Sequence, residues 1–306
     1  MVVWKRQWQK IHDSIWDAIK RKREIMDRVF EVRKMIKYMS YDDKVKLAHD
    51  VVYDVFDRCK NISVAFSGGK NSLIVLHIVK NVADELDKDF KVHFCNTTVE
   101  YKETVDYVHW LAKQWGLELY ELRPKKGITF WKILEKWGLP NYQRALYGEP
   151  KCCYWLKVEP VVRYVKAKRI DCTITGITAE ESLARLTRIA KSGLIFESEH
   201  ISGAKLPFKI INAHPIGLWR DIDCEKYIKD NNLPVNPAYE KYGLKRCGCK
   251  PCVGFKNWTK ELAERHPNLY KLVMKKVSEY DMSKLGHSQT TLDVFDYSEY
   301  LDEDEK

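Results

Sequence analysis

Short segments rich in β-branched and aromatic residues alternate with stretches of helical periodicity, and this alternation restricts the fold more than any other feature of the chain. The pattern predicts strands at 61–66, 91–96, 117–120 and 171–176, and helices at 72–82, 101–115 and 158–167. Strands that are separated by helices usually pair in parallel, and the helices then cover both faces of the sheet. We therefore expect an α/β fold built on a parallel twisted sheet.

The composition restricts the class of protein. The 306 residues are enough for one large α/β domain with additions, or for two domains. Lys and Arg outnumber Asp and Glu by 53 to 43, a net charge of +10. This charge favours anionic partners such as nucleotides, nucleic acid or an acidic redox protein, although a solvated basic surface also explains it. No apolar run reaches the roughly 18 residues that span a membrane, and no signal peptide is visible, so we expect a cytoplasmic protein.

Two tight cysteine pairs mark the second half of the chain: Cys152 with Cys153, and Cys249 with Cys252. Without a secretory signal, such pairs favour metal ligands over disulfides. A C-x2-C turn aims two thiolates at one site, whereas adjacent side chains diverge and suit a [4Fe-4S] cluster, in which each thiolate reaches a different iron. Zinc, or a metal-free site with Cys153 buried in a core, are the alternatives. Cys247 is a spare or substitute ligand.

A glycine-rich turn follows the first predicted strand, in the sequence Ser67-Gly68-Gly69-Lys70-Asn71-Ser72. Two glycines allow a tight turn that brings backbone N–H groups close to an anion, and the following helix adds the positive end of its dipole. The Lys ammonium and the two hydroxyls can bind phosphate oxygens. The pattern differs from the Walker loop, and a plain turn is the less favoured alternative because the segment ends a buried first strand.

Several motifs in the same order resemble the sulfonucleotide (APS/PAPS) reductase family of the PP-loop adenine-nucleotide α-hydrolase superfamily, over about residues 60–255. The glycine-rich turn is similar to the family's S-G-G-x-D-S loop. The other matching segments are Asn96-Thr97-Thr98 with Glu103-Thr104, Lys151 to Pro160, Gly176 to Arg185, and the run from His214-Pro215-Ile216 through Trp219, Asp223, Asn236-Pro237 and Tyr239 to Gly248-Cys249-x-x-Cys252.

We expect three regions. Apolar residues at helical spacing predict a helical extension at 1–58. It is followed by a PP-loop nucleotide-binding domain at 59–212 and by a small module at 213–306, which completes the iron–sulfur site and carries the acidic tail 302–305. The resemblance implies an adenine nucleotide (APS, PAPS or ATP) and a [4Fe-4S] cluster. The nucleotide ligands would be Ser67, Gly68, Gly69, Lys70, Asn71, Ser72, Asn96, Thr97, Gly176, Glu181, Ser182 and Arg185. The cluster ligands would be Cys152, Cys153, Cys249 and Cys252, and the catalytic residues would be Lys157, Arg185 and Cys247.

Four departures from the family pattern bear on the reaction. Asn71 replaces the usual acid of the loop, Thr98 replaces a glycine, and Thr178 stands where an Arg is common. No cysteine follows Cys252, although reductases of this family attack sulfur with a C-terminal cysteine. Cys247, or a thiol from a partner, would have to supply that nucleophile.

Three functions therefore stay open at this point. The first is reduction of APS or PAPS to sulfite, with a thioredoxin- or ferredoxin-like electron donor. The second is ATP-dependent thiolation of tRNA or DNA through an adenylate, for which the basic N-terminal extension and the aromatic residues offer nucleic-acid contacts. The third is a non-catalytic nucleotide-binding subunit. We also expect a homo-oligomer, and we interpret His214 before Pro215 as shaping a turn.

Overall fold

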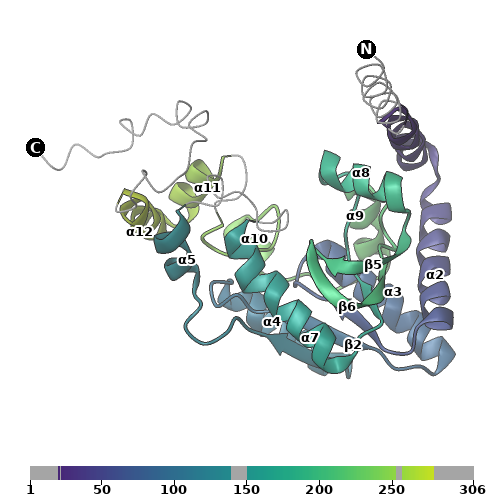
Figure 1. The fold of residues 1–306 in the computed structure, drawn as a ribbon, viewed down its shortest axis with the longest axis horizontal. Coiled ribbons are helices and arrows are strands. Elements are labelled where there is room, and N and C mark those ends of the chain that lie inside the picture. The colour runs from purple at the N-terminus through teal and green to yellow at the C-terminus, as the bar shows by residue number, and fades with distance from the viewer. Residues whose placement is uncertain (1–19, 21, 139–149, 253–256, 279–306) are drawn as a thin grey trace, which may run out of the picture.

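The computed structural model describes residues 20, 22–138, 150–252 and 257–278 (Figure 1). The first part of the predicted helical extension and the acidic tail 302–305 lie outside these residues. Residues 22–38 are helical, as expected for the remainder of the extension. None of the helices in these ranges is long and apolar enough to cross a membrane.

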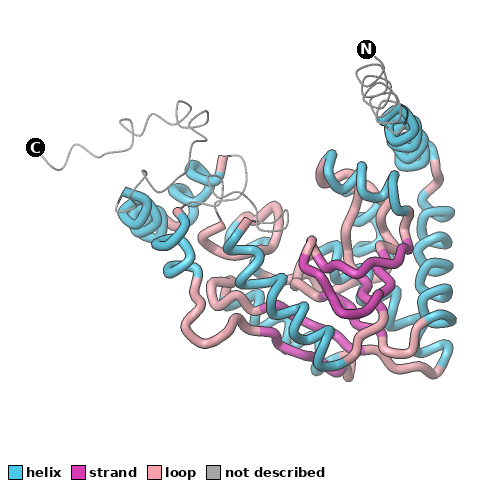
Figure 2. Tube along the Cα trace, viewed as in Figure 1, coloured by secondary structure: helices cyan, strands magenta, loops and turns pink. Residues whose placement is uncertain are grey.

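A six-stranded sheet forms the centre of the molecule (Figure 2). The strands are β1 (Ile62–Ala65), β2 (Lys91–Cys95), β3 (Glu118–Leu122), β4 (Cys172–Ile174), β5 (Ile195–Ile201) and β6 (Ala204–Ala213), in the order β3-β2-β1-β4-β6-β5. All neighbours pair in parallel except β5, which is antiparallel to β6. The four predicted strands form, and the α/β fold is confirmed.

The hairpin of β5 and β6 was not predicted. Its turn residues Ser202 and Gly203 both have positive φ, 45° and 82°, which is the conformation of a tight type I′ hairpin turn. Over 204–210 the odd positions are largely exposed and the even positions Ala204, Leu206 and Ile210 are buried. Because a two-residue turn rather than a helix joins β5 to β6, the edge strand β5 runs antiparallel to β6.

Helices cover both faces of the sheet, as predicted. Their bounds are α2 (Tyr41–Arg58), α3 (Lys70–Leu86), α4 (Lys102–Gln114), α5 (Phe130–Trp137), α6 (Lys151–Cys153), the π-helical turn η1 (Tyr154–Val158), α7 (Glu159–Lys168), α8 (Leu183–Ser192), α9 (Asp221–Asp230), α10 (Ala238–Tyr242), α11 (Trp258–Arg265) and α12 (Pro267–Ser278). Helices α2, α3, α4 and α9 share the largest core with the sheet. Helix α7 packs on the opposite face, against β3 and β6.

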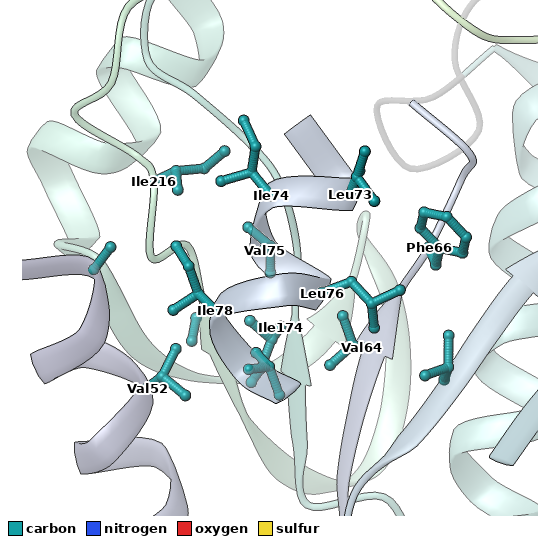
Figure 3. Close-up of a cluster of buried hydrophobic side chains, with 14 of the residues drawn as sticks. Val52, Val64, Phe66, Leu73, Ile74, Val75, Leu76, Ile78, Ile174 and Ile216 are labelled. Carbon is teal, nitrogen blue, oxygen red and sulfur yellow. The ribbon is translucent and has the colours of Figure 1, made fainter. Parts of the chain in front are cut away.

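The first half of α3 is buried on nearly every side (Figure 3). Leu73, Ile74, Val75 and Leu76 are each at most 1% exposed. A helix that is apolar all round belongs in a core, and here it lies between the sheet and α2. Because this turn of helix is held so firmly, the glycine-rich loop that precedes it has a fixed position.

A second apolar cluster forms at one end of the molecule, where α5, α11 and α12 lie together (Figure 1). Its buried members are Phe130, Ile133, Leu134, Leu156, Trp258, Leu262 and Val273, and Cys152 packs against it. This cluster positions the segment that carries the first cysteine pair.

Candidate functional site

The loop between β1 and α3 is tied together by its own serines. Ser72 Oγ donates to the Gly69 carbonyl oxygen (2.9 Å), accepts from the Ser67 N–H (3.3 Å) and lies 3.1 Å from Ser67 Oγ. Gly68 has φ 75°, a conformation that favours glycine. Gly69 caps α3 without a side-chain bond, and the first turn of α3 holds no acidic residue. These features match those of an anion site at a helix N-terminus, and the role of the loop residues as nucleotide ligands stays a prediction.

Gly176, after β4, lies against the backbone of this loop. A Cβ built on Gly176 would come within 2.7 Å of Asn71 C and O and 2.8 Å of Ser72 N. No side chain fits there, so the predicted glycine is required by close backbone approach. The side chain of Lys70 turns aside, since its Nζ lies 3.9 Å from Glu225 Oε1 and 5.3 Å from the centre of the Tyr239 ring.

The segment after β2 forms the next wall of the site. Asn96 Nδ2 donates to Glu121, and Asn96 Oδ1 accepts from the Thr98 N–H (2.9 Å). This bond supports Thr98 at φ 69°, an unusual conformation for threonine at a position where the family pattern has glycine. Thr97 Oγ1 donates to Glu100 Oε1 and lies 3.4 Å from Cys249 Sγ. The wall thus reaches from the nucleotide loop to the cysteines.

Glu181, Ser182 and Arg185 have local partners at the start of α8. Ser182 is the N-cap, and its Oγ accepts from the Arg185 N–H at 3.2 Å. Glu181 pairs with the Arg185 guanidinium. Arg185 lines the cavity that holds the cysteines. The roles of these three residues as nucleotide ligands remain predictions.

The two predicted cysteine pairs come together in space. Cys152, Cys153, Cys249 and Cys252 line one cavity of about 700 Å³, together with Cys247. The first pair lies on α6, immediately before the π-helical turn, and such turns often occur at functional sites. The second pair lies on a turn closed by the bond from the Cys252 N–H to the Cys249 carbonyl oxygen (3.0 Å).

The thiols are near enough to influence one another's ionisation. The pKa of Cys152 is raised well above its usual range by its hydrogen bond with Cys153, by burial, and by the charges of Cys249 and Cys252. Burial raises the pKa of Cys249 to about 12, although nearby Lys157 opposes that shift. Within the described ranges, no three His, Cys, Asp or Glu side chains are grouped closely enough to hold a metal ion.

A second cavity, of about 490 Å³, lies over the carboxyl ends of β1, β2 and β4 and extends along the β5–β6 hairpin. We call it the nucleotide cavity, because Ser67 of the glycine-rich loop lines it. Ligands of open α/β sheets bind at this edge. Its volume falls in the range typical of small-molecule sites.

Lys157 and Cys247 line both cavities. Interaction with the ionisable groups of Cys249, Glu100 and Cys153 outweighs burial and raises the pKa of Lys157, so its ammonium is charged at neutral pH. Cys247 Sγ accepts from Asn236 Nδ2 (3.3 Å) and donates to the Gly68 carbonyl oxygen (3.5 Å). Burial raises the pKa of the Cys247 thiol. The two side chains connect the loop to the cysteine cavity.

Two residues that line the nucleotide cavity, Glu100 and His214, were not among the predicted site residues. Glu100 lines the nucleotide cavity and accepts from Thr97, but nothing in its local sequence distinguishes it from a surface carboxylate. His214 is 3% exposed and lines the same cavity. The sequence signal available for His214 was its position directly after a strand in which exposed and buried residues alternate.

Comparison with known proteins identifies the family. A profile of the phosphoadenosine phosphosulfate reductase domain matches residues 61–255, more than half of the chain. The chain belongs to this family. The match covers the loop, both cysteine pairs and the hairpin between them, so the family relationship extends over the whole site.

Individual relatives agree with the family. An uncharacterized protein of Methanocaldococcus jannaschii is 31% identical over 77% of this chain, but the chain spans only 55% of that relative's length. An adenosine 5′-phosphosulfate reductase of Oceanobacillus iheyensis is 24% identical, and the alignment covers 69% of this chain and 79% of the length of that reductase. Among solved structures, the FMN adenylyltransferase of Candida glabrata is 12% identical, and the superposition covers 79% of this chain and 83% of the adenylyltransferase chain. Its TM-score of 0.50 shows a shared fold.

Proposed function

We propose that this member of the reductase family is an iron–sulfur enzyme of sulfur metabolism, which binds an adenosine sulfonucleotide and reduces its sulfate to sulfite with release of AMP or PAP. The observation that carries the proposal is that Lys157 and Cys247 line both the nucleotide cavity and the cysteine cavity. A cation and a thiol at this junction meet the needs of the reaction, which are charge neutralisation and a nucleophile.

The cysteine cavity fits a [4Fe-4S] cluster better than a single zinc ion. One tetrahedral ion needs four converging thiolates, and the described residues offer no such group. A cluster with four irons suits thiols spread around the wall of one cavity, as Cys152, Cys153, Cys249 and Cys252 are. When bound, the cluster would order the segments that carry the four cysteines and change the local electrostatics of the site.

Replacing Cys249 by serine should therefore remove most of the iron, because a hydroxyl is a much poorer ligand for iron than a thiolate. Iron and acid-labile sulfide of anaerobically purified protein, together with visible absorbance, measure the effect. We expect about four of each per wild-type chain and less than half in Cys249→Ser. The matched control is Cys247→Ser, which removes a thiol that lines the same cavity but is not one of the four proposed ligands. This variant should retain the wild-type iron and sulfide content. Wild-type protein that holds zinc without sulfide would contradict the assignment.

The reaction balances with the residues of the site and an external dithiol. Cys247 Sγ attacks the sulfate sulfur, an S–S bond forms, and the S–O bond to the nucleotide breaks so that AMP or PAP leaves with the bonding electrons. One thiol of the reductant then attacks Cys247 Sγ and releases sulfite, and its second thiol restores Cys247 and closes a disulfide in the reductant. Lys157 and Arg185 would neutralise the sulfate oxygens.

Replacing Gly176 by alanine should weaken AMP binding at least about tenfold, because the new methyl group would displace the loop backbone at Asn71 and Ser72. Isothermal titration with AMP measures the change. The control is Gly116→Ala, at φ 64° with no atom within 4 Å of a built Cβ, which strains the backbone without touching the loop. It should lose stability but keep its affinity for AMP. Equal affinities of Gly176→Ala and wild type would contradict the proposed position of the nucleotide.

A second candidate function is supported by the charges around the cysteine cavity. Arg185, Lys245, Arg246, Lys250 and Arg265 line it, and Glu261 is the carboxylate among its lining residues. Such a concentration of cations suits a polyanion better than a single sulfonucleotide. In this candidate function, ATP activates an oxygen of a nucleic acid as its adenylate, and sulfur then displaces AMP.

One set of anaerobic assays distinguishes the candidates. Sulfite released from labelled APS or PAPS in the presence of a dithiol supports the reductase. AMP and a thiolated nucleotide, formed from ATP and bulk tRNA or DNA with a sulfide source, support the sulfurtransferase. Binding of nucleotide without either product would indicate a non-catalytic nucleotide-binding subunit.

A further inference from the structure

The helix at residues 22–38 is held on the molecule by one apolar face. Its anchoring side chains recur at spacings of three and four residues, and they are Ile25, Val29, Val32 and Ile36. They share an apolar cluster with Leu186 and Ile189 of α8, and Arg28 Nη1 donates to the Lys191 carbonyl oxygen (3.5 Å). The helix therefore lies against α8 (Figure 1), and its other side chains are exposed.

A second face of this helix combines cations with apolar groups. Successive side chains of a helix are about 100° apart, so residues at spacings of three, four and seven share one side. Six exposed residues lie in this way within about 100° of the circumference: Arg23, Met26, Phe30, Arg33, Lys34 and Lys37. We call them the basic–aromatic face. The acids of the helix, Glu24, Asp27 and Glu31, lie outside this sector.

Two aromatic rings of the helix are turned to solvent. Phe30, on the basic–aromatic face, is 59% exposed, and Tyr38, at the end of the helix, is 72% exposed. Lys34 Nζ lies 4.7 Å from the centre of the Phe30 ring, and Lys37 Nζ lies 5.0 Å from that of Tyr38. Lys34 also pairs with Glu31 (2.9 Å), but an ion pair between exposed side chains is weak and easily exchanged. Each ring thus has a cation beside it.

These features fit a single-stranded nucleic acid. Unpaired bases stack on exposed aromatic rings, and Lys and Arg bind the phosphates between them. Phe30 and Tyr38 are eight residues apart, about 12 Å along the helix axis, so each ring meets a different base. The bases of a duplex are already stacked on one another and offer no face to such rings.

Two other occupants fit this face less well. A second copy of the chain, related by a two-fold axis, would set the cations of the face against the same cations. A membrane surface takes up the main apolar face of an amphipathic helix, and here the face with Val29 is already packed against α8.

We propose that the basic–aromatic face binds single-stranded nucleic acid, with bases stacked on Phe30 and Tyr38 and phosphates on the four cations of the face. This role goes beyond the proposed reductase function, because the described residues that line the two cavities include none from helix 22–38. The helix is nevertheless packed on α8, whose Arg185 lines the cysteine cavity and whose Arg188 lines the nucleotide cavity.

Fluorescence anisotropy of the full chain tests the proposal, with a labelled oligouridylate of about 20 nucleotides and a duplex of the same length as probes. Wild type should bind the single strand at least about tenfold more tightly than the duplex. Phe30→Ala combined with Tyr38→Ala should weaken binding of the single strand at least about tenfold and leave the affinity for the duplex unchanged, because only unpaired bases stack on the rings.

Removal of charge has a different signature. Arg33→Gln combined with Lys37→Gln should weaken binding of both probes, because both carry phosphates. For the single strand, the slope of log affinity against log salt concentration should fall by about 1.4, since each phosphate contact contributes about 0.7. A slope that does not change would overturn the role of these cations.

Matched controls remove similar side chains elsewhere. Trp110→Ala deletes an exposed aromatic ring on α4 and should bind the single strand like wild type. Lys113→Gln combined with Lys166→Gln removes two exposed cations and should keep the wild-type salt slope. Because every replaced side chain is exposed, the melting temperatures of all variants should match that of wild type.

Three outcomes would overturn the proposal. The first is wild-type protein that does not bind the single strand, and the second is a Phe30→Ala, Tyr38→Ala variant that keeps the wild-type affinity. The third is a change in the oligomeric state of that variant, measured by light scattering, without a change in affinity, which would assign the face to contacts between copies of the chain. Sulfite release tests the proposed function separately, and none of these outcomes alters it.

Discussion

Replacing Cys247 by serine should abolish sulfite release, by at least about a thousandfold, and leave the bound iron intact. A serine hydroxyl is not ionised at neutral pH and attacks sulfur poorly, so removal of the thiol removes the proposed nucleophile. The hydroxyl can still accept from Asn236 Nδ2 and donate to the Gly68 carbonyl oxygen, the two hydrogen bonds that Cys247 makes now. Loop geometry and nucleotide affinity should therefore persist.

Single-turnover assays with labelled APS or PAPS under anaerobic conditions measure this effect, with AMP affinity and iron content determined on the same protein. The matched control is Cys95→Ser, which removes another thiol that lines the nucleotide cavity. Cys95 is half-buried, and its Sγ lies 3.9 Å from the Lys157 carbonyl oxygen. The control should retain sulfite release. Unchanged turnover in Cys247→Ser would eliminate Cys247 as the nucleophile and leave a partner's thiol for that role.

Replacing Lys44 by methionine should cost about 3–5 kcal/mol of stability at neutral pH, because it leaves a buried carboxylate without its counter-charge. Lys44 is 1% exposed, and its Nζ donates to Asp223 Oδ2 (2.6 Å) and to the Ile36 carbonyl oxygen (2.9 Å). Asp223 Oδ2 also accepts from the Arg220 N–H at the start of α9. One buried ion pair thus joins α2, the preceding helix and the cap of α9.

The pH dependence of this loss has a definite sign. Burial opposes ionisation of Asp223, but the hydrogen bonds from Lys44 and Arg220 outweigh it and hold the pKa of the carboxyl below its usual value. A depressed carboxyl pKa stabilises the fold above the unfolded pKa of about 4, and this contribution is lost as the pH falls through the folded value. The difference between wild type and Lys44→Met should therefore be large at pH 7 and shrink towards pH 3.

Urea unfolding at both pH values, followed by circular dichroism, measures the difference. The control is Lys226→Met on α9, which removes a 2.7 Å ion pair with Asp230 whose side chains are 53% and 43% exposed. An exposed pair of this kind is worth at most about 0.5 kcal/mol. A loss below about 1 kcal/mol in Lys44→Met, or one that does not change with pH, would show that the buried pair is not what joins these helices.

The local sequence predicted the strands and helices that carry the site better than it predicted which side chains bind each other there. The strands before the loop and before Asn96 form where expected, because β-branched runs ended by polar turns encode them directly. The sequence did not reveal that Ser182 caps α8 or that Glu181 pairs with Arg185, since the same motif supports ligand and structural roles equally well. Glu100 had no local signal at all.

The chain's sequence alone determined the anion loop, the parallel strands around it and the two thiol pairs, because each depends on residues within one turn or one strand. Only the tertiary structure decided that the two thiol pairs line one cavity and that Cys247 lies beside Gly68. The physical reason is that segments about a hundred residues apart meet through strand order and through the apolar cluster of α5, α11 and α12. Such long-range packing leaves no periodicity in the sequence from which it can be predicted.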